Sequence, residues 1–306
     1  MSAVKIGTGL PMAIEPREPG VPTIAGAARD IEAAGLESVW MPDLVTGDGM
    51  PTLEAALTLA TAAAVTEQVA IGFSVLVVPL RPAPWLATQV ATLQHLSGNR
   101  LILGVGSGGF PQAPFWQALG VSARSRGRLT DATLELLPRL MSGQPVEYTE
   151  SEPAVTLTQA PAAPMPPVLV GGSERAFGRV LDHADGWFPS LTAPADLAGP
   201  VRRLRERAEE RGLARPEVTV GGHLIMMAKE DGPSAYDAFV TNLVDVHHMP
   251  PETAARVPMV ARTPAELAEI FAAYEDAGAD RVVAGSDNGA WAEQLDFIAE
   301  ARAQLG

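Results

Sequence analysis

Two clusters of small residues follow apolar segments of the chain and could hold a ligand against the backbone. Gly171-Gly172-Ser173 comes directly after Val168-Leu169-Val170 and opens a helical segment. Free backbone amides, a small hydroxyl and the helix dipole converge there on an anion, which is the chemistry of a phosphate site. The alternative is that the glycines serve only a tight strand-to-helix turn. Gly106-Ser107-Gly108 follows a second apolar segment, Leu101 to Val105, in the same way.

Three side chains are candidates for moving a proton: Asp43, Asp48 and His223. Asp43 follows an apolar segment and a proline, so it either reaches a site or braces the next loop. His223 lies in a predicted strand, where it is either an acid or base or a satisfied core histidine. We name Asp43 and His223 as the catalytic candidates.

The remaining histidine and tryptophan patterns are less informative. His247 and His248 are adjacent and lack the i, i+4 spacing that places two metal ligands on one helix face, so we interpret them as surface residues and predict no metal site. Trp187 follows Asp185-Gly186, and it either points near a barrel mouth or packs in the core.

Composition excludes several classes of function. The chain of 306 residues has no cysteine, which excludes disulfides and thiolate chemistry. Its net charge of −14, with Lys5 and Lys229 as the only lysines, argues against nucleic-acid binding, which needs clustered cations. The scarcity of lysine also disfavours Schiff-base chemistry. A serine hydrolase is disfavoured too, because the sequence has no G-x-S-x-G elbow between a strand and a helix. Apolar runs are too short to span a bilayer, so we expect a soluble cytoplasmic protein with no membrane partner.

The elements that must position these residues are clearest between Val69 and Gly109. An apolar segment from Val69 to Val78 predicts a buried strand, Trp85 to Leu96 has helical spacing, and Leu101 to Val105 predicts a second strand. A strand, a helix and a strand in this order form a right-handed crossover, which binds ligands at the carboxyl ends of its strands. Those ends are Ser74 to Pro79 and Gly104 to Gly109.

The whole chain continues this alternation. We count eight predicted strands separated by helices, which favours a (β/α)8 TIM barrel over a doubly wound sheet. We therefore expect residues 1–306 to form one barrel domain, with insertions near 142–166 and 231–260. The first insertion contains a predicted hairpin and is long enough to cover a pocket mouth.

Five blocks of the sequence, in order, resemble the luciferase-like family of flavin- or F420-dependent oxidoreductases. They are IEAAGLESVWMPD (31–43), VAIGFSVLVVPLRPAPWLATQVATLQHLSGNRLILGVGSG (69–108), RGRLTDATLELLPRLMSGQPV (126–146), PPVLVGGSERAFGRVLDHADGWFPS (166–190) and RTPAELAEIFAAYEDAGADRVVAG (262–285).

The resemblance implies a barrel that holds an isoalloxazine or deazaflavin ring across the strand carboxyl ends, often in a homodimer. It implies a bulge in the third strand, frequently with a non-prolyl cis peptide, at Ser74 and Val75. It also implies that Gly106-Ser107-Gly108 approaches the ribityl and phosphate part of the cofactor. Gly171-Gly172-Ser173 matches the phosphate loop.

Two positions depart from this pattern. The family's second strand usually continues with a histidine, where this chain has Leu44, and the F420-dependent sugar-phosphate dehydrogenases have a glutamate where this chain has Gly109. The leading interpretation is an oxidoreductase that uses coenzyme F420 for hydride transfer to or from a small organic substrate. An FMN-dependent monooxygenase is the alternative. A non-catalytic cofactor-binding protein also stays open, because both usual side chains are missing.

Overall fold

Parallel strands and surrounding helices form a barrel in the structure, a computed structural model that describes residues 3–11, 21–45 and 52–305. The eight strands of the barrel are β1 (Lys5–Gly9), β2 (Ser38–Met41), β3 (Ala70–Phe73), β5 (Leu101–Gly106), β8 (Val168–Gly171), β9 (Gly186–Phe188), β10 (Glu217–Met226) and β12 (Arg281–Ser286). The helices around it are α1 (Ile24–Ala33), α2 (Ala55–Val65), α3 (Ala83–Ser97), α5 (Arg126–Met141), α6 (Phe177–His183), α7 (Pro194–Glu210), α10 (Pro264–Asp276) and α11 (Trp291–Arg302).

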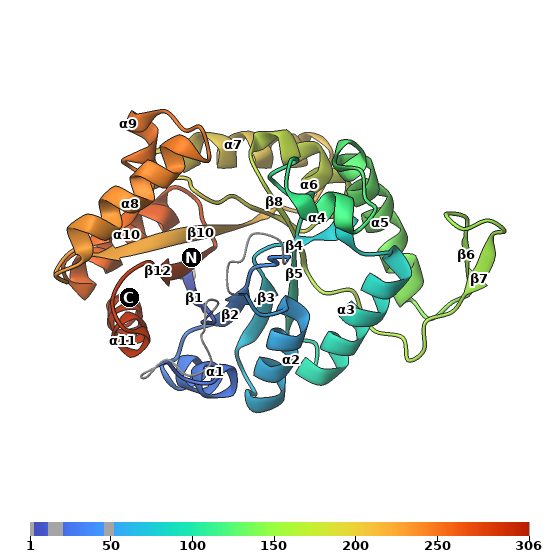
Figure 1. Ribbon diagram of the computed structural model, residues 1–306, viewed down its shortest axis with the longest axis horizontal. Helices are drawn as coiled ribbons and strands as arrows, with labels where there is room; N and C mark the ends of the chain where they lie inside the picture. The colour runs from blue at the N-terminus through green and yellow to red at the C-terminus, as the bar shows by residue number, and fades with distance from the viewer. Residues whose placement is uncertain (1–2, 12–20, 46–51, 306) are drawn as a thin grey trace.

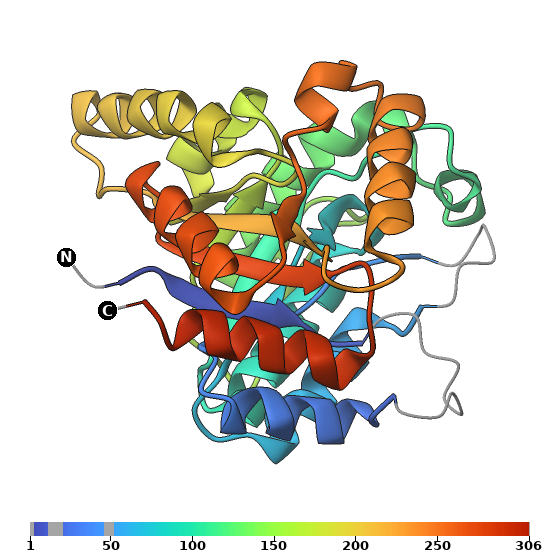
Figure 2. The same cartoon turned by 90° about the vertical axis from the view of Figure 1, so that its left-hand side faces the viewer.

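The sheet closes on itself, which confirms the predicted barrel and excludes a doubly wound sheet. β12 pairs with both β1 and β10, with Lys5 opposite Arg281, and β10 also pairs with β9, with Glu217 opposite Gly186. Figure 1 views the barrel from the carboxyl ends of its strands, and Figure 2 shows the strands side-on, with both chain termini at the opposite end. In the described ranges, no helix has the length and apolar character needed to cross a membrane.

Local signals in the sequence account for several helix boundaries. The Thr263 hydroxyl caps α10 by accepting a hydrogen bond from the backbone N–H of Glu266. Gly98 ends α3 in the left-handed conformation, with φ of 64°. α3 begins at Ala83, before the predicted start at Trp85, because Pro84 is compatible with the first turn of a helix.

A buried arginine, Arg281, lies at the amino end of the barrel. Arg281 is 3% exposed and pairs with the carboxylates of Glu37, at 2.8 Å, and Glu217. Burial alone would lower the pKa of Arg281, but its bonds to the two glutamates raise it above its ordinary value. Its guanidinium lies 5.8 Å from the ring centroid of Trp40, so the cation also packs against the face of an indole inside the barrel.

The third strand is interrupted, as the resemblance implies. β3 ends at Phe73, the peptide between Ser74 and Val75 is cis, and β4 (Leu76–Val77) resumes the pairing with β5. A single strand over Val69 to Val78 is therefore wrong, while the interruption at Ser74 and Val75 is confirmed. A 3-10 turn, η1 (Val78–Leu80), then leads into α3.

Two segments extend beyond the regular barrel. The predicted hairpin is present as β6 (Val146–Tyr148) and β7 (Val155–Leu157), and it projects outward from the barrel beside α5 (Figure 1). Residues 231–260 hold α8 (Gly232–Asp245), α9 (Pro251–Ala254) and β11 (Met259–Ala261), a short strand beside β10 that the sequence did not predict. Three smaller elements are α4 (Pro114–Ala118), η2 (Ala123–Ser125) and η3 (Glu174–Ala176).

Candidate active site

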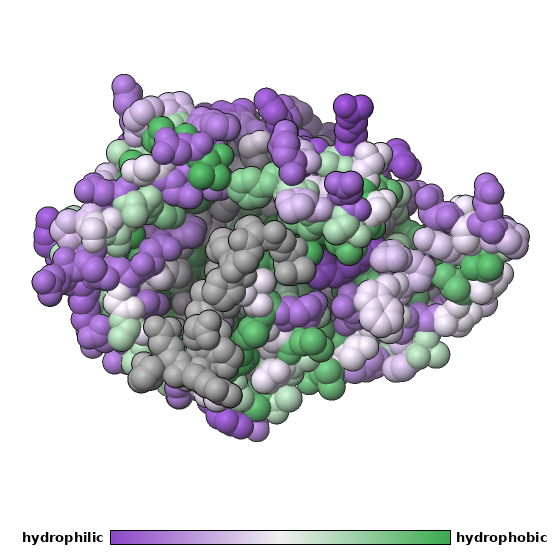
Figure 3. Space-filling view, in the orientation of Figure 1, coloured by the Kyte–Doolittle hydropathy of each residue, from purple (hydrophilic) through white to green (hydrophobic). Residues whose placement is uncertain are grey.

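A cavity of about 640 Å³ opens at the carboxyl ends of the barrel strands. This volume lies within the range that small-molecule and cofactor sites occupy. Figure 3 shows the same face of the molecule, with hydrophilic side chains predominating along its upper and left edges. Catalytic sites of (β/α)8 barrels lie at this end, so this cavity is the candidate active site.

Aromatic and aliphatic side chains form part of the cavity wall. Trp40 and Phe188 meet edge to face with ring centroids 5.4 Å apart, and Val283 belongs to the same cluster. The indole N–H of Trp40 donates to the Ser38 hydroxyl at 2.7 Å, which satisfies its polar atom within the barrel. The wall can therefore contact a flat ring by dispersion and burial.

The interrupted third strand forms another wall. Ser74 and Val75 both line the cavity. Val75 lies close to Gly106 and Gly171, where an added Cβ would come within 2.8 and 3.2 Å of its methyl groups. A side chain at Gly106 would displace Val75 and one at Gly171 would press against it, so the wall at Ser74 and Val75 depends on the glycines that the sequence singled out.

The structure brings both glycine clusters to this cavity. Gly106, Ser107 and Gly108 line it from the end of β5, and Gly171 and Gly172 line it from the end of β8. Their role in cofactor binding stays a prediction.

Ser173 belongs to the second cluster but is not among the residues that line the cavity. It lies directly before η3, and its hydroxyl makes no capping hydrogen bond there. Gly172 has a φ of 121°, which L-residues rarely adopt, so its glycine is required by the turn itself.

Trp187 contacts the glycine turn at Gly172 from the core side. It is buried, packs edge to face against Phe177, and donates its indole N–H to the Gly172 carbonyl at 2.7 Å. Of the two interpretations open from the sequence, core packing is therefore the observed one. The indole also fixes the backbone of the glycine turn.

His223 lines the cavity from β10. Its Nδ1 lies 3.0 Å from Oδ2 of Asp287, in the loop after β12, and its ring packs 4.6 Å from the Phe239 ring of α8. Leu44 and Gly109 line the same cavity, so the two family positions that lack their usual side chains do face it. Within residues 3–11, 21–45 and 52–305, His223 is the one titratable side chain on the cavity wall.

Asp43 has a different environment. It is 7% exposed and is not among the described residues that line the cavity. Its Oδ2 accepts hydrogen bonds from Arg81, at 2.6 Å, and from the backbone N–H of Val77, at 2.8 Å, while Oδ1 accepts a second bond from Arg81 at 2.9 Å. The structure thus gives Asp43 the bracing position, and a catalytic role for it stays an untested prediction.

Other predicted features lie elsewhere. Asp48 lies outside the described residues. His247 and His248 are exposed, and the ring of His247 meets Phe110 edge to face at 5.8 Å. The hairpin of β6 and β7 does not cover the cavity mouth: in the described chain, no cavity-lining residue falls within 142–166, because the hairpin extends away from the barrel axis.

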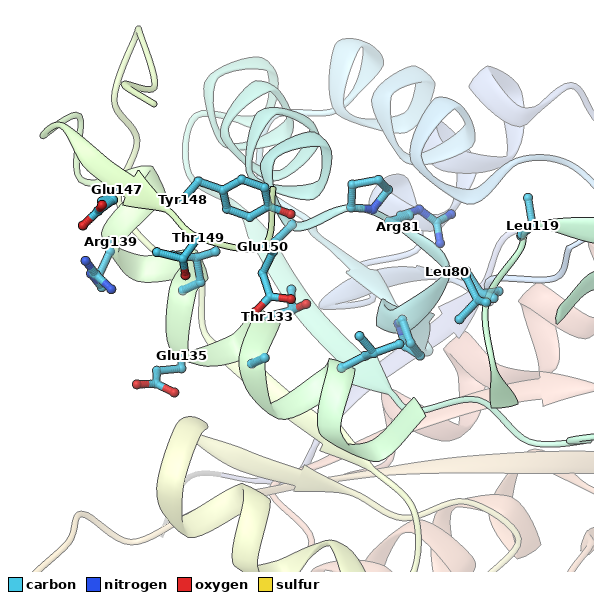
Figure 4. A pocket seen from close by; sticks show the side chains of 17 residues that line it. Leu80, Arg81, Leu119, Thr133, Glu135, Arg139, Glu147, Tyr148, Thr149 and Glu150 are labelled. Carbon is cyan, nitrogen blue, oxygen red and sulfur yellow. The ribbon is translucent and has the colours of Figure 1, made fainter. Parts of the chain in front are cut away.

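A second hollow, of about 440 Å³, lies outside the barrel between η1, α5 and the hairpin. Figure 4 shows Leu80 and Leu119 at one end and the charged Glu135, Arg139 and Glu147 at the other. Arg81 also lines this hollow, but its guanidinium is already bound to Asp43. The hollow lies outside the barrel, whereas catalytic sites of (β/α)8 barrels lie at the carboxyl ends of the strands, so the barrel cavity remains the better candidate.

Asp287 and Phe239 were missed from the sequence. The available signal was the polar run Ser286-Asp287-Asn288, which follows the apolar residues Val282 to Ala284 after one glycine. It marks a strand carboxyl end, where functional residues gather. Nothing in the sequence paired that run with His223.

Known proteins share this architecture. An F420-dependent secondary alcohol dehydrogenase, solved with an F420–acetone adduct, superposes with a TM-score of 0.80 at 18% identity, covering 98% of each chain. The FMN-bound oxygenating constituent of 3,6-diketocamphane monooxygenase from Pseudomonas putida superposes with a TM-score of 0.78 at 15% identity, covering 99% of this chain and 100% of the other. At these identities the likeness establishes the fold.

Sequence comparison establishes the family. The uncharacterized protein Rv0940c of Mycobacterium tuberculosis is 31% identical over 211 residues, which cover 62% of this chain and 72% of the relative. The profile of the family described as luciferase-like monooxygenase matches residues 4–295. The chain therefore belongs to the luciferase-like monooxygenase family.

Proposed function

We propose that the protein is an oxidoreductase that uses coenzyme F420 for hydride transfer to or from a small organic substrate, with His223 handling the accompanying proton. The observation that carries this proposal is the barrel cavity itself. Its wall combines the aromatic rings of Trp40 and Phe188, backbone exposed at several glycines and, among the described residues, one titratable side chain, that of His223. The similar solved structures bind F420 in one case and FMN in another, so FMN is the competing cofactor.

The residues present fit a tricyclic ring with an anionic tail. An added Cβ at Gly285 would meet nothing within 4 Å, so open space lies beside this strand end. Phe188, which packs edge to face against Trp40, and Val75 would contact the flat ring. The backbone at Gly172, which lines the cavity, and at Ser173, which follows it in the chain, would hold the phosphate. When bound, the cofactor supplies the hydride chemistry.

The chain's own contribution is positioning and proton transfer. Oxidation of a carbon that bears a hydroxyl group removes a hydride from carbon and a proton from oxygen, and the reverse reaction needs the proton returned. His223 is placed on the cavity wall to accept or return that proton. Leu44 adds apolar surface where the family usually supplies a histidine, which favours a substrate with an apolar side.

A homodimer is a further part of this proposal. Three large apolar side chains remain exposed on α2 and α3, at Leu57, Trp85 and Leu96. Exposed apolar side chains of this size on two helices that pack against each other support an interface with a second copy. Light scattering on the purified protein would give twice the mass of 32.0 kDa if this is correct and the monomer mass if it is not.

The test is cofactor binding with a cavity-filling variant. Gly285→Leu places a side chain in the cavity without a clash at Cβ. The control is Gly178→Leu, which adds the same side chain on the exposed surface of α6, where an added Cβ also meets nothing within 4 Å. Fluorescence titration should show F420 binding by the wild type and Gly178→Leu, and at least tenfold weaker binding by Gly285→Leu. Tight binding of FMN with none of F420 would favour the monooxygenase. Binding of neither cofactor would contradict the proposal.

Turnover separates an enzyme from a protein that only holds the cofactor. We expect the protein to oxidise reduced F420 with small ketones or aldehydes as acceptors. In the reverse direction, we expect it to reduce F420 with the matching alcohols. A cofactor that binds but never changes its redox state would support the non-catalytic alternative.

A further inference from the structure

The carboxylate of Asp287 lies next to the His223 ring, on the loop after β12. His223 lies opposite Gly285 in the parallel pairing of β10 with β12, and Asp287 follows two residues later in the chain. The Nδ1 atom of His223 lies 3.0 Å from Oδ2 and 3.3 Å from Oδ1 of Asp287. Asp287 itself is exposed and is not among the described residues that line the cavity, whereas His223 is one of them.

The backbone around Asp287 is fixed before any ligand arrives. The N–H of Asp287 donates to the Leu224 carbonyl at 3.0 Å. The next residue, Asn288, is buried, accepts from the Met226 N–H at 2.8 Å and donates to Asp231 at 3.0 Å. These bonds tie the loop after β12 to β10 and to the start of α8, so the backbone that carries the Asp287 carboxylate is fixed beside the histidine.

The histidine ring is also confined from its other side. Phe239 of α8 packs against it with a centroid distance of 4.6 Å and an interplanar angle of 36°. The ring thus has an aromatic neighbour along its face and a carboxylate at Nδ1. Together they restrict its rotation and leave Nε2 as the nitrogen without a partner among the described residues.

This arrangement decides where the imidazole carries its proton. A carboxylate at neutral pH only accepts hydrogen bonds, so the neutral imidazole must place its N–H at Nδ1 and keep a lone pair at Nε2. An aspartate that orients a catalytic histidine acts in the same way in hydrolases, where it fixes the tautomer without being protonated itself. The Nε2 lone pair of His223 is then the acceptor for a substrate proton.

We propose that Asp287 is a positioning residue that holds the His223 ring in the Nδ1–H tautomer, so that Nε2 accepts the substrate proton in the hydride-transfer reaction. This inference rests on the proposed function. It assigns to β10 and the loop after β12 the proton-handling task that the side chains at 44 and 109 cannot perform.

The first test reads the tautomer directly and needs no turnover. Long-range ¹H–¹⁵N correlation spectra at a pH where histidine is neutral distinguish Nδ1–H from Nε2–H imidazoles. The chain has five histidines, and His223→Gln identifies the signal of interest by its loss. We expect Nδ1–H in the wild type and in Asp296→Ala, an exposed aspartate on α11, and a shift towards Nε2–H in Asp287→Ala. An unchanged tautomer in Asp287→Ala would overturn the inference.

The second test measures catalysis with the active substrate of the ketone and alcohol panel. Asp287→Ala should lower kcat by about 10- to 100-fold, within the range that general acid–base catalysis contributes, with KM and F420 affinity close to the wild-type values. Asp287→Glu should restore part of the loss. If the tautomer changes while kcat does not, Asp287 has no role in the reaction. If the wild type binds neither cofactor, the proposed function fails and the inference falls with it, a result that the binding titration reveals separately.

Discussion

The Asp43 carboxylate and the Arg81 guanidinium are joined by two hydrogen bonds, of 2.6 and 2.9 Å, that connect the end of β2 to the start of α3. Asp43 also holds the Val77 N–H, two residues beyond the Val75 wall of the cavity. Asp43 is buried and Arg81 is partly buried, and the side chain of Glu54 lies 3.5 Å from Arg81. Asp43 therefore positions the cavity wall through backbone contacts.

Asp43→Ala should lower the free energy of unfolding by about 2 kcal/mol, because it leaves a partly buried guanidinium without its main partner. Urea denaturation measures this loss. Asp43→Leu combined with Arg81→Met should recover part of it, since neither charge then remains buried. An unchanged unfolding free energy in Asp43→Ala, with abolished turnover, would instead assign Asp43 to the chemistry.

Gly104 of β5 tests the packing beneath the interrupted strand. An added Cβ would lie 1.9 Å from the Phe73 carbonyl oxygen, a backbone atom that cannot turn away. We expect Gly104→Ala to lower the free energy of unfolding by about 3 kcal/mol or to prevent folding, as overpacking of a rigid core does. Gly109→Ala is the matched control, because its Cβ meets nothing within 4 Å. Equal stability of the two variants in urea would show that β3 and β5 are less closely packed than described.

Glu37 links stability to pH at the amino end of the barrel. Burial alone would raise the pKa of Glu37, but its hydrogen bonds with Arg281 hold that pKa below its ordinary value. A folded-state pKa below the unfolded value of about 4.3 contributes stability that is fully present above that value. It is lost as the pH falls through the lower folded-state value.

Glu37→Gln should therefore be less stable than the wild type at pH 7, with a difference that narrows as the pH is lowered below about 4. Urea midpoints at pH 7, 5, 4 and 3 test this, with the exposed Glu300→Gln as control. A difference that stays constant over this range would show that the charge of Glu37 is not what Arg281 stabilises.

Trp187→Phe tests whether the core fixes the glycine turn. The substitution keeps most of the apolar ring but removes the N–H that donates to the Gly172 carbonyl. We expect a loss of about 1 to 2 kcal/mol in the free energy of unfolding and several-fold weaker cofactor binding. Leu213→Val, at an exposed position after α7, should change neither. Unaltered cofactor affinity in Trp187→Phe would show that the turn holds its shape without the indole.

Much of the fold could be predicted because apolar segments and glycine or proline boundaries alternate regularly along the chain. The interruption at Ser74 and Val75 was predictable by resemblance alone, since its residues are those of an ordinary buried strand. The partner of His223 was not predictable, because Asp287 is 64 residues away and meets it only through the register of β10 with β12.

Two other features depend on geometry that residue types do not encode. Trp187 could have faced the cavity or the core, and the decision depends on the Gly172 carbonyl that receives its N–H. The direction of the β6 and β7 hairpin is likewise set by how it leaves α5, so its length alone suggested a cover for the cavity that the structure does not have.

The central claim is that the barrel cavity holds the ring system of a redox cofactor against the interrupted third strand. A crystal structure of the protein with F420 tests it most directly. The account predicts ring density against Ser74 and Val75, with the phosphate at Gly172 and Ser173 and the reactive edge facing His223. Cofactor density in the outer hollow beside Tyr148, or a barrel cavity whose side chains exclude the ring, would contradict it.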